Sequence, residues 1–203
     1  MKSSFLYSVI DSIFVNSNIF NSFRNLIHSN FRDEKNAVKR NLNTNIKTLD
    51  FGCGAGQFSP LFYSKEYYGV DVDEKYIDFC KKKRKGNFSQ IPTSPPYSFN
   101  EKFFDQILLS AVIHHINKKT LTTISQELKR ILKDNGKLMI LDHFRIEKQR
   151  NIFCKFLVYL DRGNFFRNPE EVINIFSEDF KVERKQLFKN SMYKDYVLIF
   201  SKK

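Results

Sequence analysis

The sequence predicts an α/β fold built around a mostly parallel β-sheet, and three observations support this prediction. Short apolar runs alternate with longer amphipathic segments between residues 46 and 144, which is typical of repeated strand and helix units. A glycine-rich loop follows the first apolar run directly. Two more apolar runs near the end of the chain are separated by a short turn. We therefore expect a parallel sheet that finishes in an antiparallel hairpin.

The expected strands and helices are assigned from apolar periodicity and from turn residues. Strands are predicted over 46–52, 67–73, 87–91, 103–111, 137–144, 180–188 and 193–200. Helices are predicted from Ser59 and Pro60 onward, over 74–85 with Gly86 as the C′ residue, over 120–132, and in two pieces within 151–177. The run KKKRK at 81–85 lies in the last turns of a helix, where cations complement the helix dipole. A solvated helix end explains this run without any nucleic acid.

Length and composition indicate one domain. The chain has 203 residues, 41% of them apolar and 28% charged, which is enough to bury a core without disulfides or a structural metal. We expect a single domain over 1–203 with an N-terminal helical extension over 1–45. Residues 5–27 of that extension form an amphipathic stretch rich in Phe and Ile. A helix packed on the domain is the favoured interpretation; a lid over a substrate and peripheral contact with a membrane surface are the alternatives.

The net charge of +12 favours an anionic partner such as nucleic acid. Lys, Asn, Ile and Phe are abundant while Trp is absent, however, and we favour A+T-rich coding as the explanation. Cys53, Cys80 and Cys154 are widely spaced and form no CxxC or Cys/His cluster, which argues against a disulfide framework or a zinc site. The sequence shows no apolar run of about 18 residues and no signal-peptide pattern. We therefore expect a cytoplasmic protein without a transmembrane segment.

The loop LDFGCGAGQFSP at 49–60 is the strongest local signal. A phosphate-binding P-loop would end in Gly-Lys-Ser/Thr, which does not follow Gly56. A dinucleotide-binding loop would place its third glycine at position 57, where this chain has Gln. The loop therefore excludes both of these nucleotide classes.

The stretch LDFGCGAGQF resembles motif I of the class I S-adenosylmethionine-dependent methyltransferases, which has the form (D/E)xGxGxG. Three further stretches resemble this family's motifs in the same order. YGVDVD is similar to the end of the second strand, FDQILLSAVIHHI to the fourth strand and the segment after it, and LKRILKDNGKLMILDHF to the helix, turn and fifth strand. The resemblance covers about residues 46–144. It implies a three-layer Rossmann-like sandwich with a seven-stranded sheet, a methyltransferase activity, and S-adenosylmethionine as the methyl donor.

The resemblance and the residue chemistry together indicate a donor site at the carboxyl edge of the sheet. Glycines allow close approach of a ligand because they lack a Cβ. Asp71 is placed to accept hydrogen bonds from both ribose hydroxyls, whereas Asp73 is the alternative that also fits a helix N-cap. By the resemblance, Asp50 helps to place the amino-acid end of the donor. The expected donor-binding residues are Asp50, Gly52, Gly54, Gly56, Asp71, Val72, Ser110 and Ala111.

Two departures from the family pattern lie before the fourth strand. Many relatives carry an Asp after the third strand that contacts adenine, but here only Gln90, Thr93 and Ser94 offer polar side chains, and Gln90 is the substitute we consider. SPPY at 94–97 resembles the (D/N/S)PP(Y/F) motif of some N-methylating enzymes. That motif follows strand four, whereas SPPY precedes it. We therefore expect these prolines to shape a connection.

The candidate catalytic residues follow the fourth and fifth strands and are His114, His115, Asp142 and His143. Methyl transfer mainly needs proximity and orientation, plus a base if the acceptor must lose a proton. Histidine suits that role because its unperturbed pKa is about 6.5. The alternative is structural: the two adjacent histidines fix a helix start, and Asp142 with His143 ends a strand. This mixed set does not establish a metal site, so no metal is expected.

Residues 145–178 are expected to form a helical insertion on the acceptor side, where the resembled family varies its acceptor pocket. Arg162 and Arg167 are the candidate substrate-binding residues, since guanidinium groups suit bidentate recognition of carboxylate or phosphate; alternatively, Arg162 pairs with a local acid. Two functions remain open. One is methyl transfer to a small molecule that is lipid-like, glycan-derived or anionic. The other is a nucleic-acid-binding protein, either an RNA methyltransferase or a noncatalytic adapter.

Overall fold

The computed structural model describes residues 32–145, 164–189 and 193–203. The chain divides into two compact units, Met1–Arg40 and Asn41–Lys203. The described part of the first unit belongs to helix α3 (Arg32–Asn41), which has acidic residues in its first turn and basic residues in its last, as the helix dipole favours. The predicted amphipathic stretch 5–27 lies outside the described residues. The expectation of a single domain with an extension over 1–45 stays a prediction.

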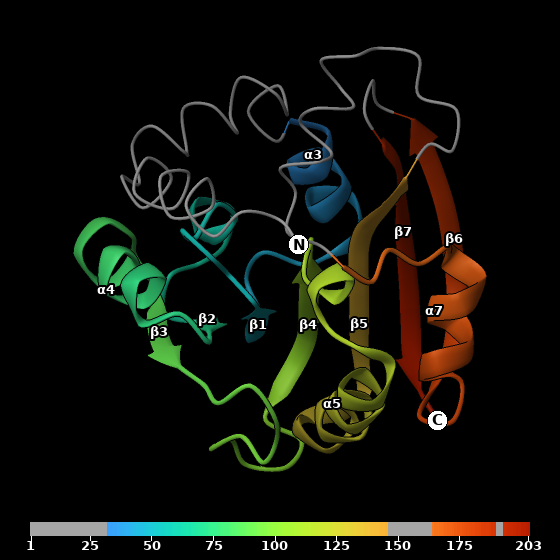
Figure 1. Ribbon diagram of the computed structural model, residues 1–203. Helices are drawn as coiled ribbons and strands as arrows, with labels where there is room; N and C mark the ends of the chain where they lie inside the picture. Colours follow the sequence, from blue (N-terminus) through green and yellow to red (C-terminus); the bar gives the residue numbers. More distant parts are fainter. Residues whose placement is uncertain (1–31, 146–163, 190–192) are drawn as a thin grey trace, which may run out of the picture. The chain divides into compact units, whose positions relative to one another are not determined.

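The strands of the described residues form one seven-stranded sheet (Figure 1). Their order across the sheet is β3 (Asn87–Gln90), β2 (Tyr67–Asp71), β1 (Thr48–Phe51), β4 (Phe104–Ser110), β5 (Leu132–Arg145), β7 (Tyr193–Lys202) and β6 (Phe180–Lys189). β1 pairs in parallel with β2 and β4, while β7 runs antiparallel between β5 and β6. The predicted α/β class, the mostly parallel sheet and the C-terminal antiparallel hairpin are confirmed.

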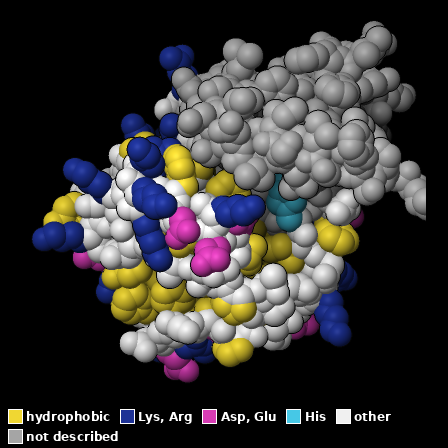
Figure 2. Space-filling model, turned by 60° about the vertical axis from the view of Figure 1, so that its left-hand side comes forward, with side chains coloured by type: hydrophobic (Ala, Val, Ile, Leu, Met, Phe, Trp, Pro, Cys, Tyr) yellow, Lys and Arg dark blue, Asp and Glu magenta, His cyan; other side chains and the backbone are white. Residues whose placement is uncertain are grey.

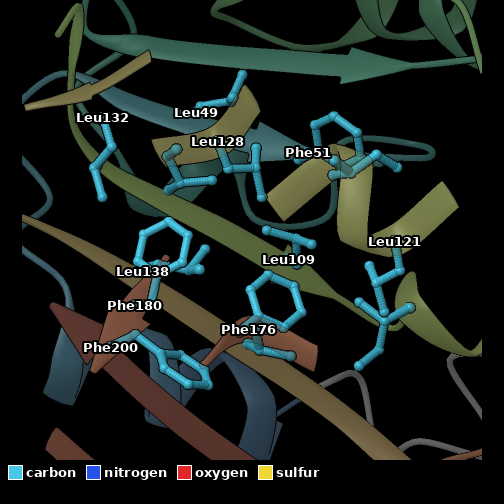
Figure 3. Packing of buried hydrophobic residues seen from close by; sticks show 14 of the residues in the cluster. Leu49, Phe51, Leu109, Leu121, Leu128, Leu132, Leu138, Phe176, Phe180 and Phe200 are labelled. Carbon is cyan, nitrogen blue, oxygen red and sulfur yellow. The ribbon is translucent and has the colours of Figure 1, made fainter. Parts of the chain in front are cut away.

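The main core lies between this sheet and two helices, α5 (Lys118–Ile131) and α7 (Pro169–Phe176). Figure 3 shows Leu121, Leu128 and Phe176 from the helices close to Leu109 and Leu138 from the central strands. None of these five side chains is exposed. The leucine and isoleucine residues whose helical spacing predicted α5 are therefore the residues whose side chains fill this core.

The opposite face of the sheet is buried as well. Leu108 of β4 and Met139 of β5 lie between the core residues in sequence, so they point away from α5 and α7. Both are completely buried outside the main cluster. Central parallel strands that are covered on both faces consist of continuous apolar runs. The runs ILL in β4 and LMIL in β5 thus indicate a sheet that is covered on both faces, as in a three-layer sandwich.

The helices of the second unit begin at side chains that cap them. α4 (Glu74–Lys83) follows Asp73, α5 follows Asn117 and α7 follows Asn168, and each capping oxygen accepts a backbone N–H from the first turn. In α7, Glu171 completes a capping box with Asn168. No helix within the described ranges is long and apolar enough to cross a membrane.

The helix predicted from Ser59 onward is wrong, because the structure has only a 3-10 turn there, η2 (Ser59–Leu61). Few residues separate this turn from β2, and two of them donate backbone hydrogen bonds that do not belong to a helix. The Tyr63 N–H donates to the Thr44 carbonyl at 2.8 Å, and the Glu66 N–H donates to the Tyr63 carbonyl at 3.0 Å. The connection is therefore too short for a longer helix, and its backbone groups already form other hydrogen bonds.

Two further boundaries differ from the prediction. α4 ends at Lys83 rather than Lys85, because Arg84 leaves the helix and its Nε donates to the Ala55 carbonyl at 3.0 Å. Gly86, expected as the C′ residue, therefore lies beyond an extended C-cap. β5 begins at Leu132 instead of residue 137, and its pairing with β4 shifts register across the predicted turn at 134–136. The turn is absorbed into the strand as an irregularity.

Candidate active site

The candidate residues gather at the carboxyl ends of the parallel strands. β1 and β4 are neighbours in the sheet although β2 and β3 lie between them in sequence, so the strand order reverses at this point. Open α/β sheets bind ligands in the crevice at such a switch point. The glycine loop leaves β1 here, Asp71 ends β2, and Ser110 ends β4. The fold thus brings the predicted donor residues to one edge of the sheet.

The glycine loop has a backbone that other residues adopt only with strain. Gly52, Gly54 and Gly56 have φ angles of 76°, 51° and 67°, in the left-handed region that favours glycine. A Cβ on Gly52 would lie 2.4 Å from a methyl carbon of Val112, whereas a Cβ on Gly54 would meet nothing within 4 Å. Gly52 therefore packs against the segment after β4, and Gly54 presents bare backbone to open space. The predicted contact between Gly54 and the donor would use this space.

Replacing these two glycines with alanine is expected to give different results. Gly52→Ala adds a steric clash with Val112 to the backbone strain, so it should lower the free energy of unfolding by about 2–4 kcal/mol. Gly54→Ala carries the strain alone, and about 1–2 kcal/mol is expected. Denaturant unfolding of both variants measures the difference. Equal losses would show that the contact with Val112 adds no cost.

Asp71 and Asp73 have separate roles in the structure. Asp71 is half-buried; its Oδ2 accepts the Gly54 N–H at 2.8 Å and its Oδ1 accepts the Asp73 N–H at 3.0 Å. Burial raises the pKa of Asp71, and the backbone hydrogen bonds oppose that rise. Asp73 is exposed and caps α4 by accepting the Lys75 N–H at 2.9 Å. The helix-cap interpretation of Asp73 is therefore confirmed, and Asp71 is the carboxylate joined to the glycine loop.

The other expected donor residues border the same loop. Val72 follows Asp71 with 48% of its surface exposed, and its carbonyl accepts the Nε2 of Gln90 at 3.0 Å. Ser110 is half-buried at the end of β4. Ala111 has a φ of 55°, which is uncommon for alanine, and its N–H donates to the Leu141 carbonyl at 2.9 Å. This turn directs the chain from β4 toward the loop. The donor contacts of these residues, and an adenine contact of Gln90, stay predictions.

Asp50 is almost fully buried, at 1% exposure, and accepts a hydrogen bond from the Tyr67 hydroxyl. Burial raises the pKa of Asp50 to about 7, while the Tyr67 hydrogen bond lowers it and the charge of Asp71 raises it further. The side chain thus titrates near neutrality. An adjacent cation, such as an ammonium group, would favour its ionised form.

The stability of the fold is expected to fall as Asp50 ionises. The folded-state pKa of about 7 lies above the ordinary value of 3.8, so the folded state holds this proton more tightly. The resulting stabilisation is complete below about pH 4 and is lost as the pH rises through about 7. Between pH 5 and 8 the wild type should lose about 3 kcal/mol relative to Asp50→Asn, which cannot ionise. Denaturant unfolding at both pH values measures this, and a pH-independent difference would contradict it.

A buried His–Asp pair lies after β4 and β5. His114, in the 3-10 turn η3 (Ile113–His115), contacts Asp142 of β5 with 2.6 Å between Nδ1 and Oδ1. The other oxygen, Oδ2, accepts the Ile113 N–H at 2.9 Å, and Oδ1 also accepts the His143 N–H at 2.8 Å. Burial alone would raise the pKa of Asp142, but the attraction to His114 and these hydrogen bonds hold it below its usual range. The carboxylate is therefore ionised at neutral pH and fixes the His114 ring.

The imidazole rings of the three candidate histidines lie close together. The centroid of His114 is 4.1 Å from that of His115 and 4.5 Å from that of His143, and Phe166 stacks on His114 at 5.3 Å. His114 and His143 are buried, whereas His115 is exposed. Figure 2 shows a histidine side chain among apolar side chains on this surface of the molecule. The structure thus brings all four candidate catalytic residues into one cluster.

This cluster also has the composition of a metal site. Within the described ranges, ligand atoms of His114, Asp142 and His143 lie within 4.8 Å of one another. The oxygens of Asp142 already accept three hydrogen bonds from the protein, which leaves this carboxylate little capacity to coordinate a metal ion. The expectation that no metal binds stays a prediction.

Arg167 fixes the position of η3 through hydrogen bonds to backbone carbonyl groups at its two ends. Its side chain is buried; Nη1 donates to the Ile113 carbonyl at 2.7 Å, and Nη2 donates to the Ile116 carbonyl at 2.7 Å. The N–H groups of Asn164 and Phe165 both donate to the His114 carbonyl. These bonds position His114, and a substrate contact of Arg167 stays a prediction. Arg162, and most of the predicted insertion over 145–178, lie outside the described residues.

Several residues of the site were not identified from the sequence. Cys80 and Arg84 were assigned to a helix and its solvated end, yet Cys80 donates to the Gly54 carbonyl and Arg84 to the Ala55 carbonyl. They lie four residues apart and so share one face of the helix predicted over 74–85, although Arg84 is the C-cap of α4 in the structure. That spacing is the sequence feature from which the shared position of Cys80 and Arg84 could have been predicted. For the contact between Tyr67 and Asp50, no local sequence feature gives such an indication.

Comparison with known proteins adds three findings. A family model described as a methyltransferase domain matches residues 49–140. The uncharacterized methyltransferase YcgJ of Bacillus subtilis is 30% identical over 161 residues, covering 70% of this chain and 60% of that protein. The ubiquinone biosynthesis O-methyltransferase of Pelagibacter ubique is 34% identical over 101 residues, covering 47% of this chain and 41% of that protein. The chain thus spans about half the length of these curated relatives.

A solved structure resembles nearly the whole chain. The magnesium protoporphyrin IX methyltransferase of Synechocystis, with bound SAH, matches with a TM-score of 0.67 at 15% identity, covering 97% of this chain and 100% of that one. This likeness shows that the two chains share a fold.

Proposed function

We propose, since the chain belongs to the class I S-adenosylmethionine-dependent methyltransferases, that it transfers a methyl group to the oxygen of a small-molecule acceptor. The observation that carries this proposal is the buried pair of His114 and Asp142, with 2.6 Å between Nδ1 and Oδ1. It lies after strands β4 and β5, at the same sheet edge as the glycine loop. An acceptor hydroxyl must lose a proton to become a good nucleophile, and a histidine held by a carboxylate is suited to take it.

The residues present fit the donor. Gly54 leaves open space where any other residue would place a Cβ, and the carboxylate of Asp71 lies against the Gly54 amide. Asp71 is the residue proposed to bind the ribose hydroxyls, and Asp50 the residue proposed to face the ammonium group. When bound, S-adenosylmethionine supplies an electrophilic methyl group attached to a sulfonium.

The chain's own residues supply orientation and a proton acceptor. Asp142 keeps the proton of His114 on Nδ1, so that Nε2 is the atom that takes the proton of the acceptor hydroxyl. The imidazolium that forms is stabilised by the ionised Asp142. Arg167 and the 164–165 backbone hold η3 through its carbonyl groups, so the ring stays in place during the transfer.

The surroundings of the pair favour an acceptor with an apolar ring. Phe166 stacks on His114 at 5.3 Å, and Phe165 is 39% exposed beside it in sequence. Aromatic side chains bury large apolar areas and stack on flat ligands. The O-methyltransferase activity in the name of one relative agrees with methyl transfer to an oxygen. We therefore propose a phenolic or enolic small molecule as acceptor, in the cytoplasmic location that the cysteine pattern suggests.

A labelled-methyl transfer assay tests this function. Protein and labelled S-adenosylmethionine are incubated with a panel of phenols and enols and, separately, with total RNA. Label is expected in the organic extract, and His114→Gln should lower its rate by about 100-fold or more. Label confined to RNA, with binding that weakens steeply as salt rises, would support the nucleic-acid alternative that the net charge of +12 favours.

A further inference from the structure

Two buried thiols lie directly behind the glycine loop. Cys53 belongs to the loop and Cys80 to α4; their exposures are 7% and 0%. Both sulfur atoms face one acceptor, the Gly54 carbonyl oxygen, at 3.7 Å from Cys53 and 3.3 Å from Cys80. Each thiol also shifts the pKa of the other. Two thiols that share one acceptor therefore support the Gly54 backbone, against which the donor is expected to bind.

The space around these sulfur atoms is tightly filled. A Cβ on Gly69 would lie 3.1 Å from the Cys53 sulfur, and a Cβ on Gly56 would lie 3.1 Å from the Cys80 sulfur. Glycine at both positions thus makes room for the sulfur atoms. Any change in their positions must be taken up by the loop or by α4, because close-packed interiors transmit such shifts.

We propose that Cys53 and Cys80 form an oxidation site, at which peroxide converts the two thiols into a disulfide and thereby weakens S-adenosylmethionine binding. The Cys80 thiolate attacks one peroxide oxygen, the O–O bond breaks, and a sulfenic acid and water form. The Cys53 sulfur then attacks the sulfenic sulfur, the S–O bond breaks, and a second water leaves. Two thiols are oxidised by two electrons, and one peroxide is reduced to two water molecules.

The pKa values of the two thiols are shifted in opposite directions by their surroundings. The hydrogen bond from Cys53 lowers the pKa of Cys80, and the nearby guanidinium of Arg84 lowers it further, although burial opposes this. The pKa of Cys53 is raised, by its bond to Cys80 and by burial. The thiolate is the form that attacks peroxide, so Cys80 is the thiol proposed to react first and Cys53 the one that resolves the product. Because both sulfur atoms are buried, peroxide reaches them only when the loop opens locally.

The effect on the donor site follows from Gly54, whose N–H and carbonyl belong to two adjoining peptide groups. The carbonyl loses both S–H donors when the disulfide forms, while the N–H is the group that binds Asp71 Oδ2 at 2.8 Å. A shift of the carbonyl also moves this N–H through the shared Cα, and the loop moves relative to the carboxylate. We expect the loss of these weak hydrogen bonds to raise the Kd of the donor about tenfold, which corresponds to about 1.4 kcal/mol.

The test measures donor binding and therefore needs no acceptor. Cys154, which lies outside the described residues, is first replaced (Cys154→Ser) so that two cysteines remain. Isothermal calorimetry with S-adenosylmethionine is performed on the full chain before and after treatment with hydrogen peroxide. We expect a mass decrease of two hydrogen atoms, a disulfide-linked peptide pair containing Cys53 and Cys80, about a tenfold weaker donor, and recovery after dithiothreitol.

Cys80→Ser in the same background is the matched control, because its hydroxyl keeps a donor for the Gly54 carbonyl. Its donor affinity should not change on peroxide treatment relative to its own untreated state. The inference is overturned if no linked peptide forms, if the disulfide forms without a change in Kd, or if Cys80→Ser loses affinity equally. Failure of the untreated protein to bind the donor would instead overturn the proposed function.

Discussion

Asp71→Ala is expected to weaken S-adenosylmethionine binding by at least about 100-fold. The carboxylate is the group proposed to accept both ribose hydroxyls, and hydrogen bonds to a charged group contribute about 1.5–3 kcal/mol each. Its Oδ2 also holds the Gly54 N–H at 2.8 Å, so the loop loses an anchor at the same time. Isothermal calorimetry on the purified variant measures the change in Kd, and circular dichroism confirms that the variant is folded.

Asp73→Ala is the matched control for this experiment. It removes a carboxylate two residues away, and that carboxylate caps α4 instead of facing the glycine loop. The donor Kd should stay within about threefold, while the free energy of unfolding should fall by about 1 kcal/mol. A larger loss of donor affinity in Asp73→Ala than in Asp71→Ala would reverse the assignment of the two residues.

Asp142→Asn is expected to lower the rate of methyl transfer by about 100-fold to 10,000-fold with the acceptor identified by the transfer screen. The asparagine keeps an oxygen for the Ile113 N–H but presents its NH₂ group to His114 Nδ1. That exchange moves the ring proton to Nε2, which can then no longer accept a proton. The value of kcat should fall, while the Kd of S-adenosylmethionine should stay within about threefold, because Asp142 is not placed on the donor.

The pH dependence separates this chemical role from a structural one. A general-base role predicts a wild-type rate that rises with pH and a flatter profile in Asp142→Asn. A variant that loses donor binding and kcat together, with an unchanged pH profile, would show that Asp142 only supports the fold. A parallel loss in thermal stability would point to the same conclusion, since a buried carboxylate with three donors also stabilises β5 against η3.

The sheet was predictable because most of its strands are apolar runs that can be recognised in the sequence one by one. Continuous apolar runs in β4 and β5 indicate burial on both faces, and the hairpin of β6 and β7 follows from two runs with a short turn. The helix after the glycine loop was not predictable in the same way. Ser59 and Pro60 are good helix-start residues, but the short distance to Tyr67 and the turn hydrogen bonds of Tyr63 and Glu66 leave only η2.

The location of a candidate residue was predictable where that residue lies at the end of one strand, as with Gly52, Gly54 and Asp71. Contacts between elements that are distant in the sequence were harder to predict. The sequence cannot tell which of the adjacent His114 and His115 is buried, because that choice depends on the turn of η3 and on Asp142, 28 residues away from His114. The placement of Cys80 behind Gly54 depends in the same way on how α4 packs.

A crystal structure with S-adenosylhomocysteine would test directly whether the edge formed by the glycine loop, Asp71 and the His114–Asp142 pair is a methyltransferase site. We expect both ribose hydroxyls within hydrogen-bond distance of the Asp71 carboxylate, the nucleoside against the Gly54 backbone, and the sulfur facing the space beside His114. A nucleoside bound elsewhere, or a ribose held by Asp73 with Asp71 turned away, would show that this edge is not the donor site proposed here.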